Sequence, residues 1–352
     1  MKVSIQEFRK TYLFDDQKDF LGKGGFGEVY KAFSKIRGEY VVLKFYNGQV
    51  SKYDVISEIK KAIKLEHPNL IRYYSGYDVE FLSGEVKQTA VMEYANGGDL
   101  KNLLRSMKNP LDRESLLKIK KIVRGILKGL AFLGDNNIIH RDIKPENLLI
   151  HITGENPNDF IIKIGDFGLA SQVQKRLVLV KEKKIDLVGT PAYMAPEIFS
   201  NDYSVLNEYG QPQISLNADL WALGMLVYFI FKRQLPFGVI NTATTYFQIR
   251  NNILHNPIPT NFDLIPQPYR TIVEQCLIRD AKKRVRRSQD LFGLVGLQNE
   301  DHKKSLPFIK PIIKPIVIKT TQINDEKTPS IKTGKIIKIS KSKQKITIKP
   351  KK

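Results

Sequence analysis

The stretch "FLGKGGFGEVYKAF", residues 20–33, constrains the fold more than any other part of the sequence. Gly22, Gly24 and Gly27 form a G-x-G-x-x-G pattern, and the missing Cβ atoms let backbone amides come close to a polyphosphate. A dinucleotide-binding fold has the same spacing but needs a helix directly after the third glycine. Here "EVYKAF" continues as a strand, so the pattern predicts strand, turn and strand. The spacing alone identifies no family.

The neighbouring residues predict a β-rich segment followed by a mostly helical one. "GEYVVLKFY" (38–46) is rich in β-branched and aromatic residues, and "KYDVISEIKKAIKL" (52–65) has a helical period that stops before His67. "AVMEYANGGDL" (90–100) predicts a strand that leaves into a glycine-containing connector. Further helices are expected at 113–134, 217–232 and 266–279. This order indicates a two-lobed α+β domain.

Composition limits the class of protein. A chain of 352 residues can bury a large core, and its one cysteine, Cys276, excludes a disulfide framework and a cysteine-rich metal site. The N-terminal "MKVSIQEFRK" lacks the apolar core of a signal peptide. The longest apolar run, from Trp221 to Phe231, is shorter than the roughly 20 residues of a membrane span and predicts a buried helix. We expect an intracellular, cytoplasmic protein, with the nucleus left open.

Lys44 and Glu58 are two charges in apolar surroundings. Lys44 follows "VVL" on the third strand, where an ammonium group needs anionic partners or must reach water. Glu58 lies between Val55 and Ala62 on the inward flank of the next helix, where a carboxylate also needs a partner. We therefore expect Lys44 and Glu58 to pair, and the remaining ammonium protons to hold phosphate oxygens.

Three further motifs follow in order, "HRDIKPEN" (140–147), "DFG" (166–168) and "APE" (195–197). Together with the glycine-rich loop, the strand lysine and the helix glutamate, they resemble the eukaryotic protein kinases over residues 14–298. Six motifs in the family's order and spacing make a chance match negligible. Parts of the chain resemble calcium/calmodulin-type kinases and parts resemble autophagy- or mitosis-related ones, so the subfamily is not placed.

The resemblance implies a fold and a reaction. The fold would have a β-rich N-lobe (residues 14–94) and a helical C-lobe (95–298). Asp142 would accept and orient the proton of the acceptor hydroxyl, and Lys144 would place a positive charge on the transferring phosphoryl group. Asn147 and Asp166 would hold Mg²⁺, which prefers oxygen ligands. The "D-x-K-P-x-N" form of the loop goes with transfer from ATP to Ser or Thr hydroxyls of protein substrates.

The nucleotide-binding residues are also implied by the resemblance. The glycine-rich loop would cover the phosphates, Met92 would lie at the back of the pocket, and Glu93 and Ala95 would offer backbone hydrogen bonds to adenine. Val42 stands where the family usually has Ala, which narrows the pocket without blocking it. The full set is Leu21, Gly22, Lys23, Gly24, Gly25, Phe26, Gly27, Glu28, Val29, Val42, Lys44, Glu58, Met92, Glu93, Ala95, Asp99 and Leu149.

Other family positions would support the catalytic loop. Glu197 would pair with Arg284 as a buried clamp, Asp219 would brace the loop from below, and Thr190 would bridge Asp142 and Lys144. His140 and Phe167 would pack as internal struts. Two segments are longer than usual in the family, residues 151–159 and 201–217, and we expect both to be surface insertions.

Residues 173–190, "VQKRLVLVKEKKIDLVGT", contain no hydroxyl before Thr190. Many kinases phosphorylate a Ser or Thr four residues before this Thr, and the phosphate docks on the Arg that precedes the catalytic Asp, here Arg141. That position holds Asp186. We expect Asp186 to replace the phosphate, so that the enzyme needs no activating phosphorylation here. The alternative is a solvated charge within "KEKKID".

Residues 299–352 differ in composition from the rest. The net charge of the chain is +21, and residues 301–352 carry fifteen Lys, three acids and no Arg. We place the domain boundary near Gln298, with residues 1–13 as an N-terminal extension and 299–352 as a Lys/Ile-rich basic tail that is expected to be disordered. The tail could also dock as a strand or bind an anionic membrane or nucleic acid, although base stacking is disfavoured because Phe308 is its only aromatic residue and it has no Arg.

Two other classes of function compete with an active kinase. A pseudokinase scaffold usually lacks at least one of Lys44, Asp142, Asn147 and Asp166, and all four are present. A nucleic-acid-binding protein built around the tail leaves the six ordered motifs unexplained. We therefore expect an active, monomeric kinase that uses ATP and Mg²⁺.

Overall fold

The computed structural model describes residues 2–24, 27–47, 55–166, 191–207, 210, 212–239, 241 and 244–298. The predictions made for Gly25, Phe26, Phe167, Asp186, Thr190 and the basic tail (299–352) lie outside these residues.

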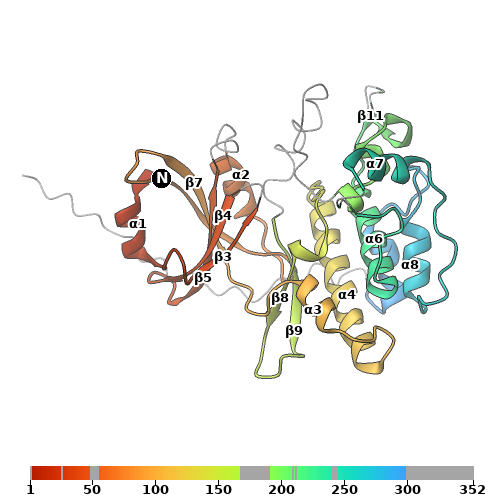
Figure 1. Ribbon diagram of the computed structural model, residues 1–352, viewed down its shortest axis with the longest axis horizontal. Helices are drawn as coiled ribbons and strands as arrows, with labels where there is room; N and C mark the ends of the chain where they lie inside the picture. The colour runs from red at the N-terminus through yellow and green to blue at the C-terminus, as the bar shows by residue number, and fades with distance from the viewer. Residues whose placement is uncertain are drawn as a thin grey trace, which may run out of the picture. The chain divides into compact units, whose positions relative to one another are not determined.

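Strands form most of the N-lobe (Figure 1), as the sequence pattern predicted. One sheet runs in the order β1-β6-β7-β5-β4-β2, and β3 also pairs with β4. All pairs are antiparallel except β1 with β6. The strands are β1 (Lys2–Ser4), β2 (Tyr12–Leu13), β3 (Phe20–Gly24), β4 (Gly27–Ser34), β5 (Glu39–Tyr46), β6 (Tyr73–Glu80) and β7 (Val86–Glu93).

Strand β5 lies between β4 and β7 and divides the N-lobe into two apolar clusters. Val41, Leu43 and Phe45 are buried in the outer cluster, whereas Val42 packs against the cluster that continues into the C-lobe. This alternation follows from the two-residue period of a strand, and it puts Lys44 on the same face as Val42. Helix α2 (Val55–Ala62) covers that face, with Val55 and Ile59 buried.

Residues 2–13 belong to the N-lobe sheet, although the sequence analysis set them apart as an extension. Ser4 caps helix α1 (Ile5–Thr11) by accepting a hydrogen bond from the Glu7 amide. Ile5, Phe8 and Tyr12 are buried in the outer cluster. The apolar outer face of the sheet needs a cover, and this short segment supplies it.

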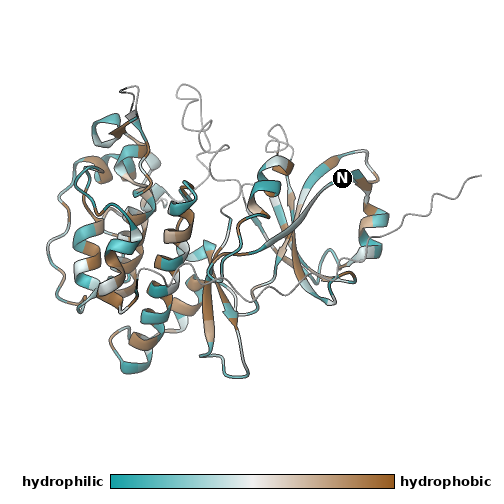
Figure 2. Cartoon of the chain, turned by 180° about the vertical axis from the view of Figure 1, so that it is seen from behind, coloured by the Kyte–Doolittle hydropathy of each residue, from teal (hydrophilic) through white to brown (hydrophobic). Residues whose placement is uncertain are grey.

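Helices dominate the C-lobe, and the long predicted ones are present. They are α3 (Leu100–Ser106), α4 (Arg113–Asp135), α6 (Ala218–Lys232), α7 (Tyr246–His255) and α8 (Tyr269–Cys276). Helix α4 alternates hydrophilic and hydrophobic residues along its length (Figure 2). The apolar run from Trp221 to Phe231 lies in α6, and both end residues are buried. No helix in the described part of the chain is long and apolar enough to cross a membrane.

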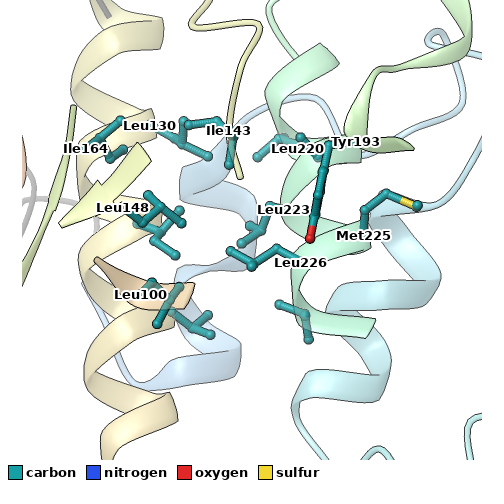
Figure 3. Packing of buried hydrophobic residues seen from close by; sticks show 14 of the residues in the cluster. Leu100, Leu130, Ile143, Leu148, Ile164, Tyr193, Leu220, Leu223, Met225 and Leu226 are labelled. Carbon is teal, nitrogen blue, oxygen red and sulfur yellow. The ribbon is translucent and has the colours of Figure 1, made fainter. Parts of the chain in front are cut away.

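The C-lobe core joins α4 and α6 to the hairpin of β8 (Leu148–Ile152) and β9 (Phe160–Ile164). Leu130 of α4, Leu148 of β8 and Leu223 of α6 point into one packed layer (Figure 3). Helix α8 approaches α6 so closely that a Cβ at Gly224 would lie 2.7 Å from the Cys276 Cβ. Ile143, within residues 140–147, is buried in the same core (Figure 3).

The two predicted insertions have local structure of their own. Residues 153–159 form the turn between β8 and β9, closed by a hydrogen bond from the Thr153 amide to the Asp159 carbonyl. Within residues 201–217, β10 (Val205–Leu206) pairs with β11 (Pro212–Gln213). Short 3₁₀ helices complete the lobe at Pro145–Asn147, Pro191–Tyr193, Pro196–Ile198, Asn201–Tyr203 and Ser288–Val295.

Phe8→Ala should lower the free energy of unfolding by about 3 kcal/mol, because it leaves a cavity in the outer cluster. Urea unfolding followed by circular dichroism measures the change. Phe247→Ala is the control, since 74% of the Phe247 side chain is exposed, and it should shift stability by less than about 0.5 kcal/mol. Equal values for the two variants would mean that α1 is not part of the cooperative fold.

Candidate active site

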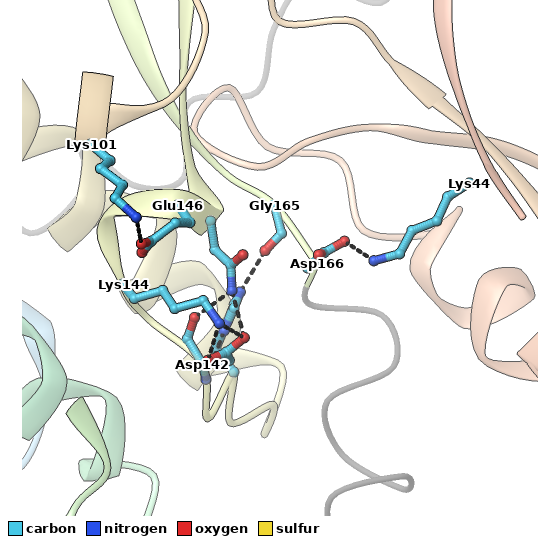
Figure 4. A network of polar contacts seen from close by, with 9 residues as sticks. Lys44, Lys101, Asp142, Lys144, Glu146, Gly165 and Asp166 are labelled. Carbon is cyan, nitrogen blue, oxygen red and sulfur yellow. Dashed lines mark hydrogen bonds and ion pairs between the residues drawn. The ribbon is translucent and has the colours of Figure 1, made fainter. Parts of the chain in front are cut away.

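The catalytic loop (residues 140–147) carries Asp142 at the centre of a hydrogen-bonded set. Lys144 Nζ lies 2.8 Å from Asp142 Oδ2 and 2.9 Å from Oδ1. Asn147 Nδ2 donates to the Asp142 carbonyl and to Oδ2, both at 2.7 Å. Figure 4 shows Lys144 and Asp142 facing one another. The structure thus brings the three predicted catalytic residues together and fixes the orientation of the Asp142 carboxylate.

Asp219, at the start of α6, braces this loop in the predicted way. Its carboxylate accepts the His140 amide at 2.7 Å and the Arg141 amide at 2.8 Å. Burial raises the pKa of Asp219, and the two amides and the nearby His140 and Arg141 side chains offset part of that rise. The loop is therefore tied to the core of the C-lobe through one buried carboxylate.

His140 is fully buried and links the loop to the segment before Asp166. The Asp142 amide donates to His140 Nδ1 at 3.2 Å, so Nε2 carries the proton and donates to the Gly165 carbonyl at 2.7 Å. Arg141 and Asp166 have φ angles of 67° and 59°, which L residues rarely adopt. Such strained backbone clusters at functional sites.

Lys44 reaches Asp166 rather than Glu58. Lys44 Nζ lies 2.7 Å from Asp166 Oδ1, and this contact joins the N-lobe sheet to the C-lobe (Figure 4). Desolvation alone would raise the pKa of Asp166, but the charge and hydrogen bond of Lys44, together with the charges of His140 and Lys144, hold that pKa below its ordinary value. The carboxylate is therefore kept ionised, as a metal ligand must be.

The predicted ion pair between Lys44 and Glu58 is wrong for this structure. Glu58 is buried on α2, and its carboxylate binds Lys61 Nζ at 2.7 Å, one turn further along the same helix. Side chains three residues apart on a helix lie next to each other, so Lys61 is a local partner for Glu58. The buried Lys44 ammonium group binds Asp166 instead. Desolvation disfavours the charged form of Asp166, and the contact with Lys44 offsets this effect.

The glycine-rich segment forms the two predicted strands, β3 and β4, which pair in antiparallel fashion up to Gly24 and Gly27. A Cβ at Gly27 would lie 1.9 Å from the Phe45 carbonyl oxygen, so only glycine fits against β5. Gly22 and Gly24 face open space, which leaves their backbone accessible. Lys23 and Glu28 form an ion pair at 3.2 Å across the two strands. The remaining loop positions in the structure, Leu21 and Val29, lie on β3 and β4.

Met92, Glu93 and Ala95 lie where β7 leaves for the C-lobe, and Val42 pairs directly with Met92. The Glu93 side chain accepts from the Arg72 amide at 3.1 Å and binds Lys163 of β9 at 3.0 Å. Sequence reasoning missed Lys163, which is 2% exposed. Its signal was present, because a lysine inside the apolar strand "FIIKI" needs an anionic partner just as Lys44 does.

The last two predicted nucleotide contacts, Asp99 and Leu149, form an isolated β-bridge with each other. The Asp99 carboxylate caps α3 by accepting the Asn102 amide at 2.8 Å. Nearby, Lys101 Nζ lies 2.7 Å from Glu146 Oε1 (Figure 4). Desolvation would raise the pKa of Glu146, but the hydrogen bond and charge of Lys101 hold it below its ordinary value.

Glu197 and Arg284 form the predicted buried clamp. Arg284 donates from both terminal nitrogens to the two Glu197 oxygens, at 2.8 and 2.9 Å, and neither side chain is exposed. Arg284 also donates to the carbonyls of Ile278, Asn217 and Arg279. Every side of the guanidinium group is therefore satisfied, which a buried charge requires.

Asn147 and Asp166 fit the Mg²⁺ site that the motifs imply. Asn147 Nδ2 donates to two oxygens of Asp142, so its amide oxygen is left for a cation. Asp166 uses Oδ1 for Lys44 and retains a second carboxylate oxygen. Among the described residues no group of three or more His, Cys, Asp or Glu could hold a metal alone. Two oxygen ligands completed by phosphates and water suit Mg²⁺.

The sequence matches the protein kinase domain over residues 16–291. The chain belongs to the protein kinase family. Calcium-dependent protein kinase 6 of Plasmodium berghei is 33% identical over 257 residues, which cover 72% of this chain and 15% of that protein. The probable serine/threonine-protein kinase fhkD of Dictyostelium discoideum is 28% identical over 290 residues, 80% of this chain and 36% of that protein. The chain thus spans well under two thirds of the length of either relative. The match to the protein kinase domain also confirms the predicted two-lobed α+β fold.

Arg284→Lys should destabilise the kinase domain by about 3 kcal/mol, because lysine keeps the charge but cannot form the bidentate pair or satisfy the three carbonyls. Urea unfolding measures the difference. Arg286→Lys is the control, since Arg286 is exposed, and it should leave stability within about 0.5 kcal/mol. A neutral Arg284→Lys would contradict this account of the clamp.

Proposed function

We propose that this kinase domain transfers the γ-phosphate of ATP to Ser or Thr hydroxyls of protein substrates. The observation that carries the proposal is the convergence of Lys144 and Asn147 on the Asp142 carboxylate. The printed names of the two relatives, a calcium-dependent protein kinase and a probable serine/threonine-protein kinase, support the same reaction class.

The geometry suits the removal of a proton from an acceptor hydroxyl. The Asp142 carboxylate lies beside Lys144 and is oriented by Asn147, so it can accept a hydrogen bond from a Ser or Thr hydroxyl. It can take the proton of that hydroxyl as the bond from the hydroxyl oxygen to the γ-phosphorus forms and the bond from that phosphorus to ADP breaks. Lys144 can then move toward the transferring group and balance its charge. Bound Mg²⁺ would neutralise the phosphate oxygens, with Asn147 and Asp166 as its protein ligands.

The N-lobe supplies the nucleotide contacts in this proposal. The backbone at Gly22 and Gly24 is open to phosphates, and Lys44 can bind phosphate oxygens while it stays close to Asp166. Val29, Val42 and Leu149 would hold the adenine ring, with the backbone of Glu93 and Ala95 at its edge. Because the Glu93 side chain is tied to Lys163, its main chain is held in a fixed position.

A pseudokinase scaffold is the alternative function. It would bind nucleotide or partners without transferring phosphate. The alternative has no support from the residues themselves, because Lys44, Asp142, Asn147 and Asp166 are all present and the first, second and fourth lie in charged contacts.

Asp142→Asn should reduce the incorporation of labelled phosphate into a Ser/Thr peptide array by about 10²–10⁴-fold, since it removes the proton acceptor. ATP binding in the presence of Mg²⁺, measured by calorimetry, should be retained. Asp263→Asn, a change at an exposed acid, is the control and should keep full activity. Wild-type protein that binds ATP but labels no Ser or Thr peptide would favour the scaffold.

We also propose that Asp186 replaces an activating phosphate by pairing with Arg141. Asp186 lies outside the described residues, and the support is its sequence position four residues before Thr190. Arg141 follows the buried His140 and is held by Asp219, so its place next to the catalytic Asp is fixed. A charge-assisted contact contributes about 1.5–3 kcal/mol.

Asp186→Ala should lower kcat by about 10- to 100-fold, because the loss of a contact worth about 1.5–3 kcal/mol reduces the active population by a factor of ten for each 1.4 kcal/mol. Glu182→Ala, a nearby acid in the same charged run, should leave kcat unchanged. A phosphatase-treated wild-type sample should keep its activity. Equal kcat for Asp186→Ala and wild type would remove this proposal and leave the transfer reaction untouched.

The basic tail and the cellular setting extend the proposal. With fifteen Lys and three acids, residues 301–352 would attract an anionic partner electrostatically, through a membrane, a nucleic acid or an acidic protein. We place the kinase in the cytoplasm, with access to the nucleus, and propose that it acts as a monomer.

A further inference from the structure

A cavity of about 650 Å³ opens on the C-lobe beside α4, and none of its lining residues belongs to the candidate active site. Its walls come from α4 (residues 114–128), from residues 67–69 and from residues 158–162 around the start of β9. Ligand-binding pockets commonly have volumes of about 300–1,000 Å³. The cavity is large enough to hold two or three side chains of a partner.

The floor of this cavity is apolar and rigid. Phe160 and Ile162 are buried there, and a Cβ at Gly125 would lie 2.1 Å from Ile162 Cγ2, so α4 packs directly onto β9. Asn69 Nδ2 donates to the Ile162 carbonyl at 2.8 Å. Leu117 stands at the edge with 58% of its surface exposed. The floor is thus preformed, with one large apolar side chain offered to a partner.

The rim is strongly basic. Five of the lining residues are cations and one, Glu114, is a carboxylate; the cations are Lys118, Lys120, Lys121, Arg124 and Lys128. Glu114 is already engaged by Lys118 at 2.7 Å. Lys121 Nζ donates to the Asn158 carbonyl at 2.7 Å and lies 3.7 Å from Asp159. The charge at this rim is therefore far from balanced by neighbouring acids.

Arg124 and Lys120 are the two rim cations available to a ligand. Neither side chain has an ion pair or hydrogen bond within the described ranges of the chain, and Arg124 is half-buried against the cavity. A carboxylate brought by a ligand would give the Arg124 guanidinium and the Lys120 ammonium group charge-assisted hydrogen bonds.

We propose that this cavity is a docking site for an acidic peptide segment of a protein partner, one that places a bulky apolar side chain on the floor and carboxylates at the rim. Charge complementarity selects the acid, and the exposed Leu117 and the buried Phe160 and Ile162 select the apolar anchor. This site would add a binding function to phosphate transfer, because none of its lining residues belongs to the candidate active site.

Two other occupants fit less well. The chain's own tail is strongly basic, so the rim would repel it. A nucleic acid could contact the rim cations through its phosphates, but it carries no bulky aliphatic group for the apolar floor. Bases could not stack in the cavity either, because the two aromatic lining residues, His67 and Phe160, are 7% and 6% exposed. An acidic peptide with Leu or Phe uses both the floor and the rim.

The test measures binding of a fluorescein-labelled peptide in which Glu alternates with Leu and Phe, using fluorescence anisotropy and the full chain. The double variant Lys120→Glu/Arg124→Glu should raise Kd by at least about tenfold, because two charge-assisted contacts become repulsions. Leu117→Asp should weaken binding as well. Lys282→Glu/Arg286→Glu, which makes the same charge change at exposed positions, should leave Kd unchanged.

The basic tail would also attract an acidic peptide, so the experiment must show whether the peptide contacts the cavity or the tail. A benzophenone in place of one Phe ring of the peptide should crosslink to residues 114–128 or 158–162, as mapped by mass spectrometry. Crosslinks confined to residues 299–352, or a Kd that the Lys120→Glu/Arg124→Glu variant does not change, would overturn the proposal. An all-Glu peptide or heparin that binds with equal affinity and the same variant response would overturn the apolar anchor. Thermal unfolding of each variant excludes misfolding, and Leu117→Asp, at an exposed position, gives an independent reading.

Discussion

The catalytic loop depends on one buried carboxylate. Asp219 accepts two consecutive amides, those of His140 and Arg141, and these contacts hold Arg141 in a left-handed conformation that an unsupported chain would leave. Asp142 follows directly, with its own amide bound to His140. Because Asp219 sits at the start of the fully packed α6, the position of Asp142 is set by the core of the C-lobe and not by the loop itself.

Three ion pairs between a lysine and a carboxylate, two of them made by a buried lysine, show how the fold pairs its charges. Lys163 satisfies Glu93 at the connection between the lobes, Lys44 satisfies Asp166, and Lys61 satisfies Glu58. The Lys44–Asp166 contact joins a β-strand of one lobe to the catalytic segment of the other, and the charge of Lys44 helps to hold the pKa of Asp166 below its ordinary value.

Local sequence patterns were enough to predict the glycine-rich hairpin, strand β5 and helices α4, α6 and α8, since each has a clear period or a strong turn signal. They were not enough for residues 2–13, whose short strands and single helix have little pattern of their own and are stabilised by burial of Phe8 and Tyr12 against the sheet. The motif positions around Asp142 and the Glu197–Arg284 clamp came out as predicted. The predicted ion pair between Lys44 and Glu58 is absent, because Lys44 binds Asp166 and Glu58 binds Lys61. Which carboxylate a buried lysine binds depends on distances in three dimensions and on desolvation, and the spacing of residues along the chain does not give either.

The charges around the active site also bear on how a substrate is selected. Glu146 is engaged by Lys101, and Asp99 caps α3, so two acids that could attract basic residues of a substrate are already partly satisfied. A peptide that competes for Glu146 must displace Lys101, which reduces the net gain from that contact. A separate basic, apolar-floored cavity on α4 would add binding energy and specificity at a distance, since a tethered second contact raises the local concentration of the acceptor segment.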